Sequence, residues 1–167
     1  MLLEDKTVVV YGVTAPHSAV LVRAFASQRA LIFLADSSRD NADAAARRII
    51  DAGGVAEAAE VDLFDRGRLQ EYTAELVEWT GGIDVAVVAI GGEDAGAQLT
   101  AAETAAEQMA AQGSGMIVIM SATRANERDY WQFAERAAAD GVAVLPVFRA
   151  PDPGQCRTVT TDRAALA

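Results

Sequence analysis

The segment Tyr11–Ser18, YGVTAPHS, contains residues that could bind a phosphate group, because it joins a short apolar run to a stretch of helical periodicity. A turn at a helix N-terminus presents backbone N–H groups and a positive dipole end to an anion. Gly12 and Thr14 lie in this turn, and His17, the only histidine, could contact a phosphate or act as a base near neutral pH. The plainer alternative is that His17 is merely exposed near a helix end.

Further polar residues and glycines directly follow the next apolar runs of the chain. Asp36 ends the second run, Asp62 and Leu63 follow the third, and Gly91 follows the fourth. If these runs are parallel strands, their carboxyl ends meet at one edge of a sheet, where ligands bind near the switch in strand order. We therefore expect these residues and the first turn to form one candidate binding site.

A second polar group follows the fifth apolar run. Ser121, Thr123 and Arg124 could line the same crevice, and an arginine there could hold an anionic ligand by bidentate contacts. The alternative is a polar loop with an ordinary surface ion pair. Cys156 has no histidine near it in sequence, so a nucleophilic role is not expected. With one cysteine and one histidine in the chain, we expect no metal site.

The elements that position these residues alternate along the chain. The expected strands are short apolar runs: Thr7–Tyr11, Ala30–Ala35, Ala56–Val61, Val85–Ile90, Met116–Met120 and Val142–Val147. The expected helices have apolar residues at helical spacing: Ser18–Gln28, Asn41–Ala52, Arg66–Trp79, Leu99–Gln112 and Glu127–Ala139. Continuous apolar strands indicate a sheet that is covered on both faces, and interleaved helices indicate parallel crossovers.

The predicted fold class is therefore α/β, a Rossmann-like, doubly wound parallel sheet of about six strands with helices on both faces. Residues 1–167 are expected to form one domain. Residues 150–167, which include Pro151 and Pro153, are expected to be an irregular tail that could form a short edge strand.

Composition narrows the possible functions. The formal net charge is −10, and no block of basic residues stands out, so nucleic acid is not an expected partner. No apolar run approaches the ~20 residues of a membrane span. The first residues, MLLEDKTVVV, have the wrong order of charges for a secretory signal. We therefore expect a cytoplasmic protein that does not bind membranes.

The motifs resemble the front half of a short-chain dehydrogenase/reductase. The resemblance rests on Leu3–Ala30, Asp36, Gly53-Gly54, Val61-Asp62 and Gly82-Ile83-Asp84. It implies an NAD(P) cofactor at the first turn, and Asp36, where the family carries a ribose-binding acid, would favour NAD. The alternative is that Asp36 is a solvated acid at a strand end or the cap of the next helix.

The sequence departs from the family pattern where the cofactor would lie. Pro16 and Ser18 stand where the family places its second and third glycines, which removes a backbone N–H and adds side chains. The segment Val88-Ala89-Ile90-Gly91 replaces the family's Asn-Asn-Ala-Gly. We therefore expect no tightly bound cofactor, and NAD if any.

The catalytic half of the pattern is also incomplete. In the family, a serine after the fifth strand is followed by Tyr-x-x-x-Lys, whose tyrosine donates a proton. Here the serine position falls on Ser121 or Ala122, Tyr130 is followed four residues later by Ala134, and no lysine occurs after Lys6. The chain between the fifth and sixth strands is shorter than in the family. The catalytic residues are therefore unknown.

Three functions remain open. The first is a non-catalytic member of the superfamily that binds a small molecule or oligomerises. The second is an NAD(P)-dependent oxidoreductase with an unconventional site. The third is a non-redox enzyme that reuses the nucleotide pocket, as halohydrin dehalogenases do. We also expect a homodimer or larger oligomer, because shortened crossovers should leave apolar area near strands four to six. The segment Tyr130–Phe133 is expected at or near the contact, although its aromatic side chains could equally be core residues.

Overall fold

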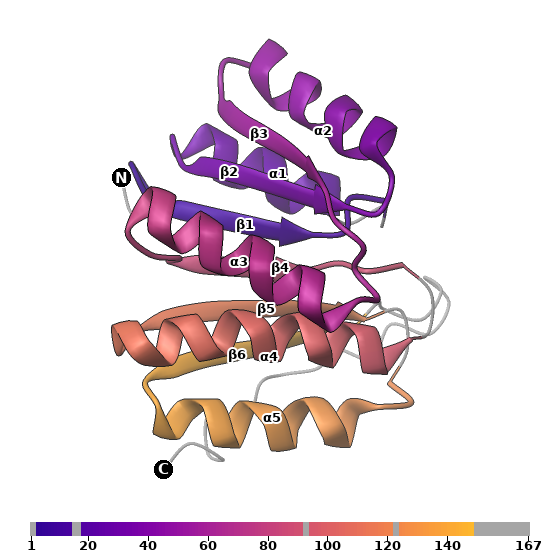
Figure 1. The fold of residues 1–167 in the computed structure, drawn as a ribbon, viewed down its shortest axis with the longest axis vertical. Helices are drawn as coiled ribbons and strands as arrows, with labels where there is room; N and C mark the ends of the chain where they lie inside the picture. The colour runs from indigo at the N-terminus through magenta and orange to yellow at the C-terminus, as the bar shows by residue number, and fades with distance from the viewer. Residues whose placement is uncertain (1–2, 15–17, 92–93, 122–123, 149–167) are drawn as a thin grey trace, which may run out of the picture.

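The fold is of the α/β class, with one parallel sheet and helices packed against it (Figure 1). The computed structural model describes residues 3–14, 18–91, 94–121 and 124–148, in which six strands alternate with five helices. The strands are β1 (Thr7–Tyr11), β2 (Leu31–Asp36), β3 (Val55–Glu60), β4 (Val85–Val88), β5 (Gly115–Ser121) and β6 (Val142–Phe148). The helices are α1 (Ser18–Ser27), α2 (Arg39–Asp51), α3 (Arg66–Thr80), α4 (Ala95–Gln112) and α5 (Glu127–Ala139).

All neighbouring strands pair in parallel, in the order β3-β2-β1-β4-β5-β6. The predicted fold class is confirmed, and most element bounds agree with the sequence within two residues. The exception is α4, which begins at Ala95, four residues before the expected Leu99, because the Asp94 carboxylate accepts a hydrogen bond from the backbone N–H of Ala97 and caps the helix (3.0 Å). The order reverses between β1 and β4, so a ligand crevice is expected there.

Alternate residues of the buried strands pack against different helices. In β1, Val8 and Val10 belong to a cluster with residues of α1 and α2, whereas Val9 and Tyr11 belong to a cluster with residues of α3, α4 and α5. Figure 1 shows α3, α4 and α5 side by side in front of the sheet and α1 behind it. This two-sided burial explains why the strand sequences are continuously apolar. No helix of the described residues is long and apolar enough to cross a membrane.

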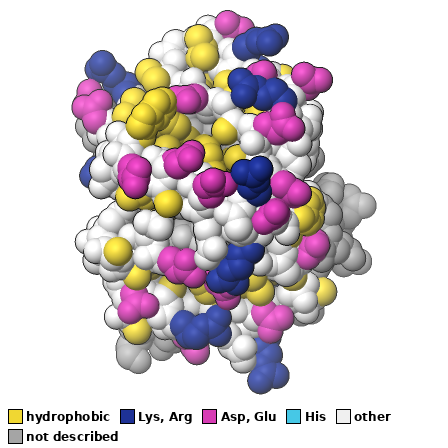
Figure 2. Space-filling model, in the orientation of Figure 1, with side chains coloured by type: hydrophobic (Ala, Val, Ile, Leu, Met, Phe, Trp, Pro, Cys, Tyr) yellow, Lys and Arg dark blue, Asp and Glu magenta, His cyan; other side chains and the backbone are white. Residues whose placement is uncertain are grey.

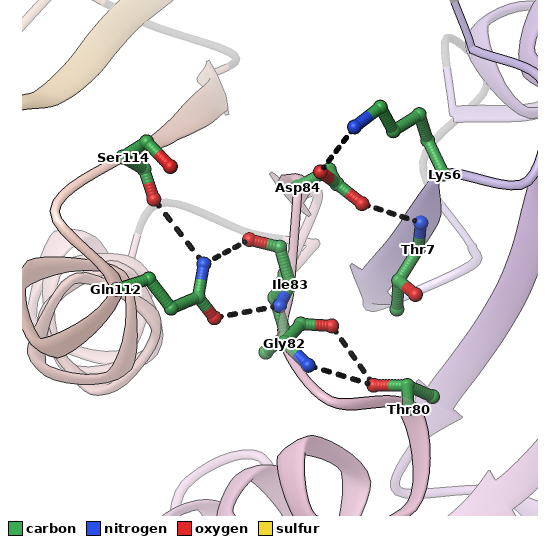
Figure 3. Close-up of polar contacts among 8 residues, drawn as sticks. All are labelled: Lys6, Thr7, Thr80, Gly82, Ile83, Asp84, Gln112 and Ser114. Atoms are coloured by element: carbon green, nitrogen blue, oxygen red, sulfur yellow. Dashed lines mark hydrogen bonds and ion pairs between the residues drawn. The ribbon is translucent and has the colours of Figure 1, made fainter.

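At the edge of the sheet where the strands begin, Asp84 immediately precedes β4 and contacts the start of β1 (Figure 3). One carboxylate oxygen accepts a hydrogen bond from the backbone N–H of Thr7 at 2.9 Å, and the other pairs with Lys6 Nζ at 3.2 Å. Asp84 thereby connects the starts of β1 and β4. Asp84 was one of the residues on which the family resemblance rests. In the structure, its carboxylate contacts Thr7 and Lys6, so its role is to hold two strands together.

Gln112, at the end of α4, joins β4 to the turn that precedes β5 (Figure 3). Its side-chain oxygen accepts from the N–H of Ile83 at 2.8 Å. Its side-chain nitrogen donates to the carbonyls of Ile83 (2.9 Å) and Ser114 (3.2 Å). The amide therefore satisfies backbone groups that the strands leave unpaired at this edge.

Replacement of Asp84 should destabilise the protein without affecting the opposite edge. We expect Asp84→Ala to lower the free energy of unfolding by about 1–3 kcal/mol, because the N–H of the buried Thr7 loses its acceptor. Asp84→Asn should cost less, since an amide oxygen can still accept. Lys6→Ala is the control, because it removes only an exposed ion pair, worth about 0–1 kcal/mol. Urea unfolding measures the loss of free energy of unfolding in each of the three variants. Equal losses in Asp84→Ala and Lys6→Ala would contradict the role given to Asp84.

Candidate functional site

Gly12 fixes the geometry of the first turn. Its φ is +88°, and its N–H donates to the carbonyl of Ala35 at 2.8 Å. A Cβ at this position would lie 2.6 Å from the carbonyl oxygen of Ala89, so only glycine fits against the end of β4. The turn and the end of β4 also meet at Thr14, whose hydroxyl lies 3.4 Å from the point that a Cβ of Gly91 would occupy. The structure thus brings Gly12, Thr14 and Gly91 together at the switch point.

Asp36 lies beside this turn, but its carboxylate is engaged by the chain's own backbone. One oxygen accepts from the N–H of Val13 at 3.0 Å and the other from the N–H of Ser38 at 2.9 Å. The residue is only 6% exposed. Asp36 is therefore neither a solvated acid nor the cap of α2, whose N-cap is Ser38. A ligand hydroxyl would have to compete with two backbone donors for these oxygens.

Ser18, which stands where the resemblance implies a glycine, contacts the first turn through its hydroxyl. It is buried at the start of α1, and its hydroxyl donates to the carbonyl of Val13 at 3.2 Å. Val13 and Ser18 also line one end of a cavity of about 510 Å³ between α1 and α2. The predicted site residue His17, and Pro16 before it, lie outside the described residues.

Asp62 and Leu63 follow β3, as the sequence predicts. The exposed carboxylate of Asp62 accepts from the N–H of Phe64 at 3.0 Å, which shapes a local turn. Leu63 is buried, and its N–H donates to the hydroxyl of Ser37 at 3.1 Å. A ligand bound here would have to displace that hydroxyl to reach the Leu63 N–H.

At the ends of β4 and β5, the buried side chain of Gln98 occupies the space beneath the edge. Its nitrogen donates to the carbonyl of Ile90 at 3.0 Å and, more weakly, to that of Met120 at 3.4 Å. Its oxygen accepts a hydrogen bond from the hydroxyl of Tyr130. Ser121 also forms a hydrogen bond with Tyr130. Gln98 therefore ties α4 and α5 to the ends of two strands.

Tyr130 is a core residue rather than an exposed acid. It is 1% exposed, and burial raises the pKa of its hydroxyl, an effect that the hydrogen bond to Ser121 opposes only in part. A general acid works best with a pKa near the operating pH, so this environment disfavours proton transfer. Tyr130 and Phe133 are buried against the chain's own sheet, whereas Trp131 between them is 45% exposed. An oligomer contact at or near the segment Tyr130–Phe133 therefore stays a prediction, and of the aromatic side chains in this segment only Trp131 could form it.

The sequence analysis did not single out Gln98. Its signal is a long amide within a helix whose other buried residues are mainly alanine, because such a residue needs buried hydrogen-bond partners. Only the structure shows that these partners lie on two strands and on α5.

Among the polar residues expected to line the crevice after β5, Arg124 already contacts nearby side chains. Arg124 pairs with Glu127 at 2.9 Å, and its guanidinium lies 5.0 Å from the centre of the Phe148 ring. These contacts match the alternative of a surface ion pair more closely than an open anion site. Thr123 and Cys156 lie outside the described residues. Within the described part of the chain, no cluster of acidic, histidine or cysteine residues could hold a metal ion.

The described residues fit a dinucleotide cofactor poorly. The start of α1 offers a helix N-terminus next to the turn, as a phosphate site requires. However, Asp36 already binds two backbone N–H groups, the N–H of Leu63 is taken by a hydroxyl, and Ser18 adds a side chain beside the turn. A cofactor would have to displace these contacts.

The structure resembles solved short-chain dehydrogenases/reductases, although no protein-family profile and no curated protein matches the sequence. A metagenomic short-chain oxidoreductase in complex with NADP is 20% identical, with a TM-score of 0.78 over 91% of this chain and 85% of that one. NAD⁺-bound xylitol dehydrogenase is 15% identical, with a TM-score of 0.78 over 91% and 74%. Hydroxysteroid dehydrogenase from Escherichia coli is 18% identical, with a TM-score of 0.77 over 86% and 74%. The resemblance predicted from the sequence is thus confirmed for the fold.

The chain's three tyrosines should not titrate normally in the folded protein. Burial raises the pKa of Tyr11, Tyr72 and Tyr130 above the ordinary value of about 10. The unfolded chain therefore loses these protons first, so stability should fall as pH rises above about 10. Tyrosinate absorbance should appear only together with unfolding. A tyrosine that ionises near pH 10 while circular dichroism remains native would contradict the burial described above.

Proposed function

We propose that this chain uses the short-chain dehydrogenase/reductase fold as a non-catalytic scaffold that binds a ligand or oligomerises, and that it does so in the cytoplasm. One observation carries the proposal: Gln98 holds the hydroxyl of Tyr130 in a buried hydrogen bond. The family's tyrosine needs a lysine that lowers its pKa, and the only lysine, Lys6, pairs with Asp84 at the opposite edge of the sheet. A tyrosine that donated a proton as in the family would therefore lack its lysine in this chain.

Weak cofactor binding is part of this proposal. Two of the similar structures are described with NADP or NAD⁺ bound. In this chain, the contacts of Asp36 and Leu63 occupy groups that a dinucleotide would use. Breaking such contacts lowers affinity, because buried donors and acceptors lose partners before they gain new ones.

Calorimetric titration tests the proposal. We expect dissociation constants for NAD, NADH and NADPH weaker than about 10 μM, which corresponds to roughly 7 kcal/mol. Reduction of a panel of ketones and aldehydes should be undetectable with either reduced cofactor. Tighter binding would overturn the expected weak cofactor binding, and turnover would overturn the proposed lack of catalysis.

Variants would then separate the two enzymatic alternatives. Turnover that is lost in Tyr130→Phe would favour an oxidoreductase that uses this tyrosine. Turnover that survives Tyr130→Phe and Ser121→Ala but disappears in His17→Ala would favour a relocated acid or base. Reaction without any dinucleotide would favour non-redox chemistry in the same crevice.

Homo-oligomerisation through the rear face of β5 and β6 is the second part of the proposal. Met116, Leu145 and Val147 project from the face opposite α4 and α5 and are 45%, 50% and 39% exposed. On that face, α1 and α2 cover mainly β2 and β3, so no described helix packs over β5 and β6. Residues 149–167 include only two large aliphatic side chains, those of Val159 and Leu166. A second copy, which offers the same apolar face, is the better cover.

Sedimentation equilibrium at micromolar concentration tests this contact. We expect a dimer or larger closed oligomer that Leu145→Glu dissociates, because a buried unpaired charge opposes association. Trp131→Glu is the matched control, since Trp131 is also 45% exposed but lies on α5. A monomer of the wild-type chain, or dissociation by Trp131→Glu alone, would contradict the assignment.

A further inference from the structure

A groove opens on the front of the sheet where β2 and β3 extend beyond α3. It has a volume of about 660 Å³ and lies on the opposite face of β2 from the cavity between α1 and α2. Figure 2 shows hydrophobic surface bordered by acidic side chains in the upper part of this face. Next to Tyr72, which lines the groove, a buried hydrogen bond of 2.7 Å between the hydroxyls of Tyr11 and Thr73 holds α3 to β1.

Aromatic side chains form much of the groove. Phe33 of β2 and Tyr72 of α3 are partly buried, whereas Trp79, in the last turn of α3, is 74% exposed. Large aromatic side chains are costly to leave in water and are enriched at interaction surfaces. Trp79 therefore presents most of its surface to an incoming group.

Three carboxylates surround these rings: Glu57 from β3, and Glu75 and Glu78 from α3. Among the described residues, none of the three forms an ion pair, although their neighbour Glu71 on α3 pairs with Arg68 at 3.0 Å. Burial is the main cause of the raised pKa of Tyr72, and the negative charge of Glu57 adds to it, which places this carboxylate close to the ring. A concave surface lined by one sign of charge concentrates ligands of the opposite sign.

The combination of rings and carboxylates selects a particular cation. A guanidinium group is planar and weakly hydrated, stacks on aromatic faces and forms bidentate hydrogen bonds with carboxylates. A lysine ammonium is more strongly hydrated and lacks the planar fork. We propose that this groove binds an arginine side chain presented by an extended segment of a partner protein.

The position of the groove suits an extended segment. β3 is the outer strand of the sheet and pairs only with β2 among the described strands. A segment that adds to a free strand edge forms main-chain hydrogen bonds and projects alternate side chains onto one face. Residues directed to the front face would lie next to Glu57, which points to the same side as Ala59 of β3.

Tryptophan fluorescence offers a direct test, because the chain has only two tryptophans. In a Trp131→Phe background, the signal comes from Trp79 alone. The probe is a terminally blocked peptide of alternating threonine and arginine, and the matched control replaces each arginine with citrulline, which keeps the shape and removes the charge. We expect the arginine peptide to change the Trp79 emission and to bind at least about tenfold more tightly than the citrulline peptide.

Variants of the groove complete the test. Glu75→Gln with Glu78→Gln should weaken arginine-peptide binding at least about tenfold, with unchanged circular dichroism, whereas Glu71→Gln on the same helix should not. Equal binding of the arginine and citrulline peptides, or no response of Trp79, would overturn the proposal. So would free arginine that binds as tightly as the peptide, or groove variants that alter the sedimentation of the chain alone.

Discussion

The buried amide of Gln98 is the interaction on which the account of this site depends. It reaches from α4 to the carbonyls at the ends of β4 and β5 and accepts a hydrogen bond from Tyr130 on α5. Every buried polar side-chain atom of this network has a hydrogen-bond partner. Breaking one of these bonds would leave a buried group without a partner and destabilise the fold. Removing the tyrosine's proton would place a charge in a buried site. The same contacts that hold two helices to the sheet thus oppose proton transfer at Tyr130.

At the carboxyl ends of β1, β2 and β3, polar groups are likewise paired with one another. Asp36 accepts hydrogen bonds from Val13 and Ser38, and the Ser37 hydroxyl accepts one from Leu63. In an edge built for a ligand, some of these donors and acceptors would be left for that ligand. Here they connect the first turn, the end of β2 and the end of β3 to one another. The edge therefore stabilises the sheet at the place where open α/β sheets generally bind ligands.

The sequence was sufficient for the fold because its information is local: continuously apolar strands, helical spacing and glycine at turns. It also placed Gly12, Thr14, Asp36 and Gly91 on one edge. It could not show that the Asp36 carboxylate is already occupied or that Gln98 binds Tyr130, because both depend on contacts between distant segments. For a related reason, the sequence could not decide whether Tyr130 and Phe133 are interface or core residues. A helix pattern identifies an apolar side but not the surface that covers it, and here the cover is the chain's own sheet.

Amide hydrogen exchange with and without NADH tests the central claim, that the carboxyl edge is closed by its own hydrogen bonds. The N–H groups of Val13, Ser38 and Leu63 should exchange slowly in the protein alone, because carboxylate and hydroxyl oxygens already hold them. Saturating NADH should leave their rates unchanged. Fast exchange in the protein alone that NADH slows at these three amides would contradict the account, since it would show an open edge that a cofactor completes.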